Sequence, residues 1–208
     1  MENTFWLNRW ETNQIAFHET DIHPMLTRHW SDLQIDPGAT VFTPLCGKSN
    51  DLLWIRERGH EVVGVELSAI AASAFFSENM LEAIRSDHGP FKSYSGSGYH
   101  IFCGDYFDLD RKNTGKIGAV YDRAALIALT PQQRIDYVAH LSTLLDPGAK
   151  ILLVTVCYDT NEITPPPFIV DRHEIEALYG ALYSIEYLST SPALIKDKPG
   201  EEIVYRME

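Results

Sequence analysis

Hydrophobic and polar positions follow one another along this chain in short blocks that predict strands and helices in turn. Runs rich in β-branched, aliphatic and aromatic residues predict seven strands, at residues 40–45, 62–66, 99–103, 116–121, 149–156, 183–190 and 202–206. Apolar residues at helical spacing predict helices near Pro24, over residues 51–58, from Ser68 to about Ile84, and over residues 131–145 and 171–179. The stretch from Ser86 to Gly98 carries Gly, Ser and Pro without a clear period, so we expect a loop there.

This alternation of strands and helices predicts an α/β fold with a mainly parallel sheet, because parallel strands need crossover connections. The last two strands have no helix between them, only a polar hairpin connection over residues 196–200, and we expect that pair to be antiparallel. We find no internal repeat and no interdomain linker, so residues 1–208 are interpreted as a single domain.

Composition and charge narrow the functional class. The 208 residues are 45% hydrophobic and 22% charged, with a formal net charge of -12, which argues against a general nucleic-acid binder. The first 20 residues hold four charged side chains and no apolar signal core, and no apolar stretch reaches the about 18 residues of a membrane helix. Three widely spaced cysteines suggest neither a zinc site nor a disulfide framework. We therefore expect a soluble, cytoplasmic protein without a membrane or nucleic-acid partner.

The turn after the first predicted strand and the end of the second predict a ligand site. In open α/β sheets, ligands bind beyond the carboxyl ends of the central strands. Gly47 in that turn allows a ligand to approach the backbone, and Glu66, 19 residues later, is placed to accept hydrogen bonds from both hydroxyls of a ribose.

Two phosphate-binding motifs fail here. A P-loop requires glycine where this chain has Phe42, and the dinucleotide pattern requires glycine at Leu45 and Asn50. A ribose cofactor without phosphates, such as S-adenosylmethionine, fits better. The pattern alone leaves that site and a plain nucleotide-like or ligand-free sheet about equally favoured.

Several segments resemble one known family in the order in which they occur. They are Trp10 with Ala16-Phe17-His18, Phe42-Thr43-Pro44-Leu45-Cys46-Gly47-Lys48-Ser49, Arg58-Gly59-His60, Val62-Val63-Gly64-Val65-Glu66, Tyr121-Asp122-Arg123 and Pro165-Pro166-Pro167-Phe168. Together they resemble the thiopurine S-methyltransferase family over nearly the whole chain. The resemblance implies a Rossmann-like class I methyltransferase fold, with a seven-stranded, mostly parallel sheet whose last strand is antiparallel. It also implies helices on both faces, and residues 1–35 as an N-terminal helical cover over the active site.

The resemblance implies a role for each matching residue. Arg123 is expected at the methyl-transfer region, where it serves cofactor, acceptor and catalysis, and Phe17 is expected to line the acceptor pocket. The expected cofactor-binding residues are Trp10, Leu45, Gly47, Glu66, Asp105, Tyr106 and Arg123. At Asp105 the chain departs from the mammalian pattern, which has Ser there.

Several of these residues also have a purely structural interpretation. Trp10 and Phe17 are equally typical of a packed core, and Arg123 is typical of an ion-paired residue. Cys46, beside the cofactor turn, is interpreted as a packing residue and not as a nucleophile. His18 and His23 lack the spacing of a helical ligand pair, and we expect no metal site.

The leading functional hypothesis is transfer of a methyl group from S-adenosylmethionine to the sulfur of a thiopurine or another aromatic or heterocyclic thiol, leaving S-adenosylhomocysteine. Methylation of selenium or tellurium compounds in chalcogen detoxification is one alternative, and a non-catalytic cofactor-binding protein on the same fold is another. A large acidic or protein acceptor is disfavoured by the aromatic N-terminal segment and the acidic surface. The expected partner is a small thiol or selenol, and the expected oligomeric state is a monomer.

Overall fold

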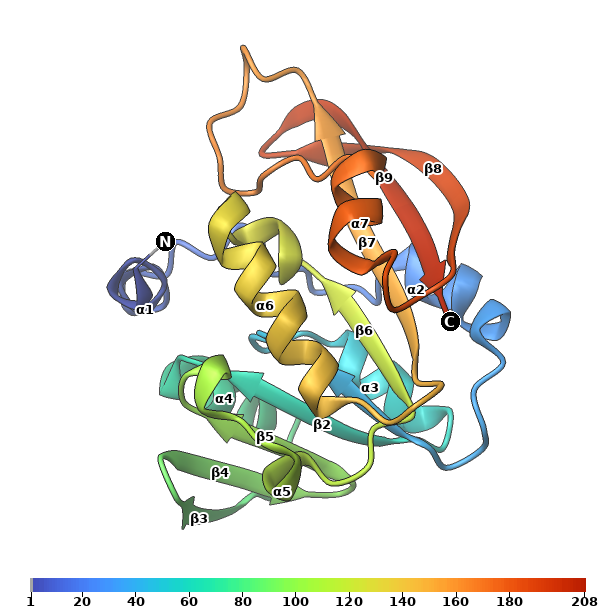
Figure 1. Cartoon of the computed structure of the whole chain (residues 1–208). Coiled ribbons are helices and arrows are strands. Elements are labelled where there is room, and N and C mark those ends of the chain that lie inside the picture. Colours follow the sequence, from blue (N-terminus) through green and yellow to red (C-terminus); the bar gives the residue numbers. More distant parts are fainter. Residues whose placement is uncertain (1) are drawn as a thin grey trace.

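The computed structural model describes residues 2–208, which form one mixed nine-stranded sheet with helices on both faces (Figure 1). In space the strands lie in the order β3-β4-β5-β2-β1-β6-β7-β9-β8. Their bounds are β1 (Thr40–Thr43), β2 (Glu61–Glu66), β3 (Ile84–His88), β4 (Phe91–Gly96), β5 (Tyr99–Cys103), β6 (Ala119–Arg123), β7 (Lys150–Tyr158), β8 (Ile185–Ile195) and β9 (Lys198–Met207).

The first helices precede β1, and the others lie in connections between strands. They are α1 (Asn3–Glu11), α2 (Pro24–His29), α3 (Asp51–Glu57), α4 (Ala69–Glu78), α5 (Arg111–Thr114), α6 (Pro131–Leu144) and α7 (Arg172–Tyr179), with 3-10 turns η1 (Trp30–Leu33), η2 (Tyr106–Asp108) and η3 (Leu126–Ala128). All helices within residues 2–208 are too short or too polar to cross a bilayer.

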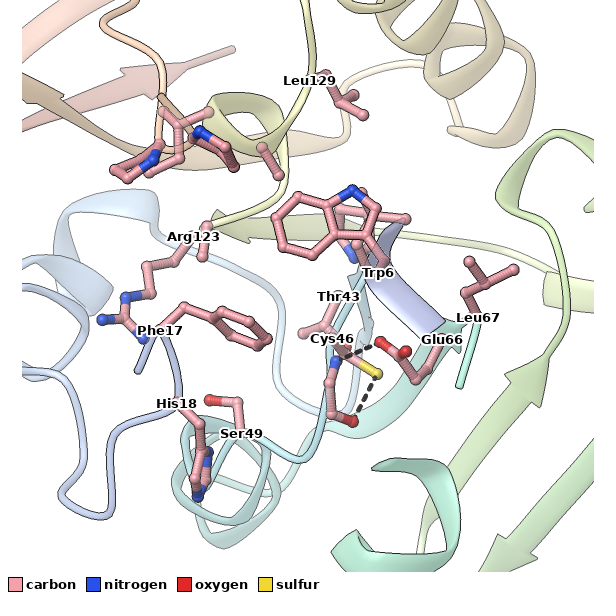
Figure 2. A pocket seen from close by; sticks show the side chains of 18 of the residues that line it. Trp6, Phe17, His18, Thr43, Cys46, Ser49, Glu66, Leu67, Arg123 and Leu129 are labelled. Carbon is pink, nitrogen blue, oxygen red and sulfur yellow. Dashed lines mark hydrogen bonds between the residues drawn. The ribbon is translucent and has the colours of Figure 1, made fainter. Parts of the chain in front are cut away.

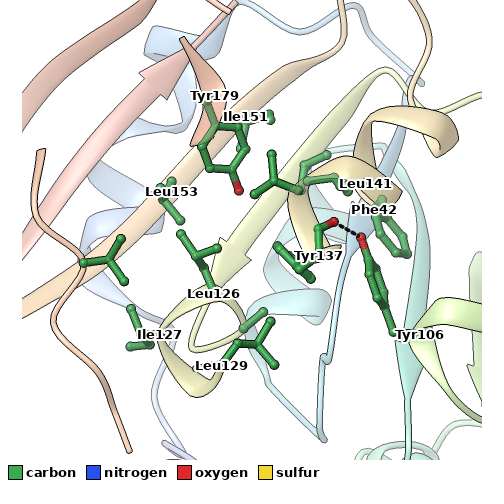
Figure 3. Close-up of a cluster of buried hydrophobic side chains, with 14 of the residues drawn as sticks. Phe42, Tyr106, Leu126, Ile127, Leu129, Tyr137, Leu141, Ile151, Leu153 and Tyr179 are labelled. Atoms are coloured by element: carbon green, nitrogen blue, oxygen red, sulfur yellow. Dashed lines mark hydrogen bonds between the residues drawn. The ribbon is translucent and has the colours of Figure 1, made fainter. Parts of the chain in front are cut away.

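The sheet separates two hydrophobic cores, because successive side chains of a strand point to opposite faces. In β7, Ile151 and Leu153 pack in the core beneath α6 and α7, whereas Leu152 and Val154 pack in the core beneath α2, α3 and α4. Figure 3 shows the first of these cores, in which the Tyr106 and Tyr137 rings stack 4.8 Å apart. A strand buried on both faces reads as a continuous apolar run, as residues 151–154 do.

The pairing confirms the predicted mostly parallel sheet. Strands β5, β2, β1, β6 and β7 pair in parallel, and β9 runs antiparallel to both β7 and β8. Parallel pairing brings the carboxyl ends of β1, β2 and β6 to one edge of the sheet, where the predicted ligand site lies.

The predicted loop over residues 86–98 is wrong. Strands β3 and β4 form a hairpin there, which pairs antiparallel with β5 and raises the strand count from the predicted seven to nine. Strand β3 is the sheet edge and all its side chains are exposed, so no alternation of apolar residues marks it. A serine pair across the hairpin, Ser86 and Ser93, joins hydroxyl to hydroxyl at 2.8 Å.

The helix predicted to run to Ile84 ends earlier, at Glu78. Met80 takes a left-handed conformation with φ 54°, and the Leu81 N–H donates to the Phe76 carbonyl at 2.9 Å. This is the helix-ending Schellman arrangement, in which glycine is the usual left-handed residue. Because methionine stands there, the sequence carried no sign of the helix end.

The last hairpin is tighter than predicted. Residues 196–200 were expected as the connection, but only Lys196 and Asp197 form the turn, with φ 50° and 62°. Two positive φ values suit the right-handed twist of the flanking strands. Strands β8 and β9 are therefore long, and their turn extends past the carboxyl end of β7, where β9 pairs Gly200 with Tyr158.

The N-terminal segment divides between two places. Helix α2 and turn η1 pack on the sheet through Met25, Leu26, Trp30 and Leu33. Helix α1 lies apart from them at the edge of the molecule (Figure 1). Of residues 2–35, only residues of α1 and residues 16–19 line the cavity described below.

A buried carboxylate ties β6 to α6. Asp122 is fully buried and accepts hydrogen bonds from the Tyr137 hydroxyl at 2.6 Å and from the Leu126 N–H at 3.1 Å. Burial raises the pKa of Asp122 to about 6, although these hydrogen bonds oppose the shift. The Tyr106 hydroxyl, by contrast, donates to the neutral Tyr137 carbonyl at 3.0 Å.

We expect Tyr137→Phe to lower the free energy of unfolding by about 1.5–3 kcal/mol at pH 8, because an ionised buried carboxylate loses a donor. The hydrogen bond favours the ionised form of Asp122. The loss of stability is therefore largest well above the Asp122 pKa of about 6 and becomes smaller as the pH falls below that value. Urea denaturation at pH 8 and at pH 5 measures the loss of unfolding free energy and its dependence on pH. Tyr106→Phe is the control, with an expected loss of about 0.5–1.5 kcal/mol at both pH values. Equal losses for the two variants at pH 8 would contradict this role of Asp122.

Candidate active site

The turn after β1 and the end of β2 meet at Glu66. The Gly47 N–H donates to Glu66 Oε2 at 2.8 Å, and the Ser68 N–H donates to Glu66 Oε1 at 2.7 Å. Leu45 and Gly47 take φ values of 47° and 55°, which fold the turn back against the neighbouring strand. Parallel pairing of β1 with β2 sets the height of this turn, so the predicted proximity of Gly47 and Glu66 is confirmed.

Glu66 is buried, with 5% of its surface exposed. Burial raises the pKa of its carboxyl to about 7, and the backbone N–H donors at Ser68, Gly47 and Leu67 only partly offset this. Each oxygen that accepts one N–H keeps a second lone pair. The carboxylate can therefore accept two hydroxyl groups on adjacent carbons, as the ribose prediction requires.

An aromatic cover from the N-terminal segment lies over this turn. Trp10 of α1 is 8% exposed, and a Cβ added to Gly47 would lie 3.2 Å from its indole, so a larger residue would displace the ring slightly and would be strained at the positive φ of 55°. The Phe17 ring meets Trp10 edge-on at 5.6 Å and Trp6 at 5.7 Å. Trp6 and Phe17 lie between Arg123 and Glu66 in Figure 2.

A cavity of about 300 Å³ extends from Glu66 beneath this cover. All the predicted site residues line it: Trp10, Phe17, Leu45, Gly47, Glu66, Asp105, Tyr106 and Arg123. The sequence interpretation missed other lining residues, among them Trp6, Arg9, His18, Glu19, Ile127, Leu129, Leu194, Lys196 and Glu202. Most of these residues lie on turns and on the last hairpin, far in sequence from the Gly47 turn and Glu66. The proline run, of which Pro166 and Pro167 line the cavity, gave a local sequence signal for this part of the wall.

Arg123, at the end of β6, forms an ion pair with Glu19 of the N-terminal segment. The Arg123 side chain is 14% exposed and that of Glu19 48% exposed, so the pair joins a buried cation to a carboxylate at the surface. Two further carboxylates line the same part of the cavity but have other partners. Asp51 accepts from the Tyr121 hydroxyl at 2.9 Å, and Glu202 contacts His23 Nε2 at 2.9 Å.

Asp105 and Tyr106 lie beyond β5, as predicted, but their polar atoms have partners in the protein. Asp105 accepts from the Phe107 N–H at 3.0 Å and from Asn3 Nδ2 at 2.6 Å, a contact with α1. The Tyr106 hydroxyl is turned into the core towards Tyr137. Tyr106 therefore presents its ring to the cavity and keeps its hydroxyl away from it.

Cys46 and Lys48 are structural neighbours of the site. Burial, followed by the charge of Glu66, raises the pKa of the Cys46 thiol well above its ordinary value, so the thiol stays protonated and poorly nucleophilic. Lys48 Nζ contacts both Glu78 oxygens, at 2.7 and 2.8 Å. Residues 2–208 contain no group of three or more His, Cys, Asp or Glu side chains arranged to hold a metal ion.

Comparison with known proteins identifies the family that the sequence predicted. The family model described as "Thiopurine S-methyltransferase (TPMT)" matches residues 1–207. A protein of Nitrosospira multiformis named thiopurine S-methyltransferase is 43% identical over 197 residues, which cover 95% of this chain and 90% of the relative. One of Pseudomonas fluorescens with the same name is 45% identical over 194 residues, 93% of this chain and 89% of the relative.

Solved structures show the fold. A Burkholderia thailandensis 1,6-didemethyltoxoflavin-N1-methyltransferase with bound S-adenosylhomocysteine superposes with a TM-score of 0.70 at 14% identity, covering 99% of this chain and 86% of that one. The magnesium protoporphyrin IX methyltransferase of Synechocystis, also with S-adenosylhomocysteine, gives 0.68 at 12% identity and covers all of both chains. The predicted class I methyltransferase fold is confirmed, with the β3–β4 hairpin as an addition to its seven strands.

We expect S-adenosylhomocysteine to bind this chain more weakly as the pH falls below 7. Ribose hydroxyls donate to the ionised Glu66 carboxylate, so binding requires the proton to leave, and affinity falls up to about tenfold per pH unit below the pKa of about 7. Calorimetric titration between pH 6 and pH 8.5 measures this. Glu66→Gln is the control, and we expect it to bind S-adenosylhomocysteine more weakly, with an affinity that does not change between pH 6 and pH 8.5. Identical wild-type affinity at pH 6 and pH 8 would rule out an ionised Glu66 as the ribose acceptor.

Proposed function

This chain belongs to the thiopurine S-methyltransferase family, and on that premise we propose that it transfers the methyl group of S-adenosylmethionine to the sulfur of a thiopurine or another aromatic or heterocyclic thiol. One observation carries the proposal. A single cavity joins the Glu66 carboxylate, suited to a ribose, to an aromatic compartment around Trp6 and Phe17. Donor and acceptor can therefore meet in one enclosed space.

We propose that the cofactor lies along the turn after β1. Glu66 would hold the ribose, Gly47 and Leu45 would flank it, and Trp10 would cover it. Asp105 and the Tyr106 ring would border the adenine, and Arg123 would meet the reactive end. The buried Glu66 carboxylate with free lone pairs and the glycine cradle under Trp10 support this placement.

The reaction mainly requires the acceptor sulfur to be aligned with the methyl group. When bound, S-adenosylmethionine supplies a methyl group already activated on a sulfonium. The new sulfur–methyl bond forms as the sulfonium–methyl bond breaks, and a thiolate acceptor leaves as a neutral thioether. Good orientation in an intramolecular reaction contributes about 7–11 kcal/mol. Trp6, Trp10 and Phe17 would exclude water and fix the plane of a flat heterocycle, and the protonated Cys46 takes no part.

Arg123 would act on the acceptor side. Its guanidinium has five N–H donors, and its hydrogen bond within residues 2–208 goes to Glu19. The remaining donors can stabilise a thiolate at the edge of the aromatic compartment. Because Glu19 is half exposed, its contact with Arg123 is weak and does not prevent this role.

The other expectations remain proposals. We propose a single domain over residues 1–208, supported by one continuous sheet, in which α1 and residues 16–19 form the cover expected within residues 1–35. A small-molecule acceptor is consistent with a methyltransferase of this family. We propose that the protein is cytoplasmic and that it is a monomer; light scattering during gel filtration tests the oligomeric state directly.

The reaction is tested by transfer of labelled methyl from S-adenosylmethionine to 6-mercaptopurine, counted after organic extraction. We expect transfer by the wild type and its loss in Glu66→Ala, because the ribose site is removed. If the wild type binds S-adenosylhomocysteine but transfers no methyl to 6-mercaptopurine, thiopurines are rejected as acceptors. Selenium and tellurium compounds, and then the non-catalytic hypothesis, would be tested next.

We expect Arg123→Ala to lower kcat/KM for 6-mercaptopurine by about tenfold to a hundredfold, because a charge-assisted hydrogen bond to the thiolate is lost. Steady-state kinetics at saturating cofactor measures this. Arg111→Ala is the matched control, since Arg111 is paired with Asp146 and does not line the cavity. Unchanged kinetics in Arg123→Ala with an ionised acceptor would remove this role.

A further inference from the structure

Two cations from distant parts of the chain line the cavity. Arg9 belongs to α1 in the N-terminal cover, and Lys196 belongs to the β8–β9 turn near the other end of the chain. They are near enough for Arg9 to lower the pKa of Lys196, after the larger effect of partial burial. The fold thus holds two like charges close together at one cavity.

Neither cation has an acidic partner within residues 2–208. Lys196 Nζ donates only to the Thr164 carbonyl, at 2.8 Å. The Arg9 guanidinium lies 4.6 Å from the centre of the Phe5 ring, and its Nη1 reaches the Gln14 carbonyl at 3.5 Å. Arg9 Nε is buried without a hydrogen-bond partner. A buried donor without a partner is uncommon and calls for an explanation.

The other long cations of this cavity differ in this respect. Lys48 is paired with Glu78, and Arg123 with Glu19. In a chain with a net charge of -12, two cavity cations that repel each other and have no carboxylate partner are conspicuous. An anion placed between them would pair with the Arg9 guanidinium and the Lys196 ammonium group and remove the repulsion.

The Lys196 turn lies on the acceptor side of the cavity, away from the strand end that carries Glu66. The ribose site is at the end of β2, and the order β2-β1-β6-β7-β9 places β9 four strand spacings away, about 19 Å at about 4.8 Å each. Leu129, Pro167 and Ile195 also line the cavity and give it apolar walls. A flat acceptor lying among them would point its far edge towards Arg9 and Lys196.

We propose that Arg9 and Lys196 form an anion subsite, which selects acceptors that carry a carboxylate or similar anionic substituent opposite the sulfur. Such an acceptor would bridge α1 and the β8–β9 turn, so its binding would also fasten the N-terminal cover over the cavity. This inference rests on the proposed function only in taking the acceptor to be an aromatic thiol.

The test is a binding measurement that needs no turnover. The full chain, saturated with S-adenosylhomocysteine, is titrated calorimetrically with the product analogues 4-(methylthio)benzoate and 4-(methylthio)benzamide, which share a shape and differ in charge. We expect the wild type to bind the carboxylate about tenfold more tightly than the amide. Lys196→Gln and Arg9→Gln should each remove most of this preference, and Arg9→Lys should keep part of it.

Lys198→Gln is the matched control, because Lys198 lies on the same hairpin, is exposed and does not line the cavity. The proposal is overturned if the wild type shows no preference for the carboxylate, or if Lys198→Gln reduces it as much as Lys196→Gln. It is also overturned if Arg9→Gln and Lys196→Gln weaken S-adenosylhomocysteine binding while the preference persists, since the anion would then be the cofactor carboxylate. A carboxylate preference in a protein that methylates no thiol would reject the proposed function and leave the subsite standing.

Discussion

The site depends on one contact, the Glu66 carboxylate with the backbone N–H groups of Gly47 and Ser68. It joins the turn after β1 to the turn after β2, so the two halves of the ribose site are held by the same side chain that would bind the ligand. Burial gives this carboxyl a pKa of about 7, which means that ionising it in the empty site is costly. A ligand that donates hydroxyl groups offsets that cost, and the site is therefore organised around a group that is poorly solvated without its ligand.

The cover over this site is fastened at several separate points. Trp10 packs on Gly47, Asn3 donates to Asp105, and Glu19 pairs with Arg123. The last two contacts are polar and partly exposed, so each contributes little on its own. The cover is separate from the cores of the sheet, which lie beneath α2, α3 and α4 on one face and α6 and α7 on the other.

Charge is distributed unevenly around the cavity. Near Arg123, the carboxylates of Glu19, Asp51 and Glu202 outnumber the cation, and each has a partner in the protein. Near the β8–β9 turn, Arg9 and Lys196 line the cavity without an ion-pair partner within residues 2–208, and their contacts are with two carbonyl groups and the Phe5 ring. The positive charge of these two side chains favours one orientation of a molecule with an anionic tail.

The sequence by itself determined the parallel core of the sheet, the antiparallel last pair and the position of Glu66 beside the Gly47 turn. These depend on local signals: apolar runs for strands buried on both faces, and a glycine turn followed 19 residues later by Glu66. Only the tertiary structure decided the β3–β4 hairpin, the end of α4 at Met80, and the cavity walls from Trp6, Leu129 and Lys196. An exposed edge strand has no buried face to impose a period, a methionine at a glycine position conceals a helix end, and residues nearly 190 positions apart become neighbours only when the sheet is complete.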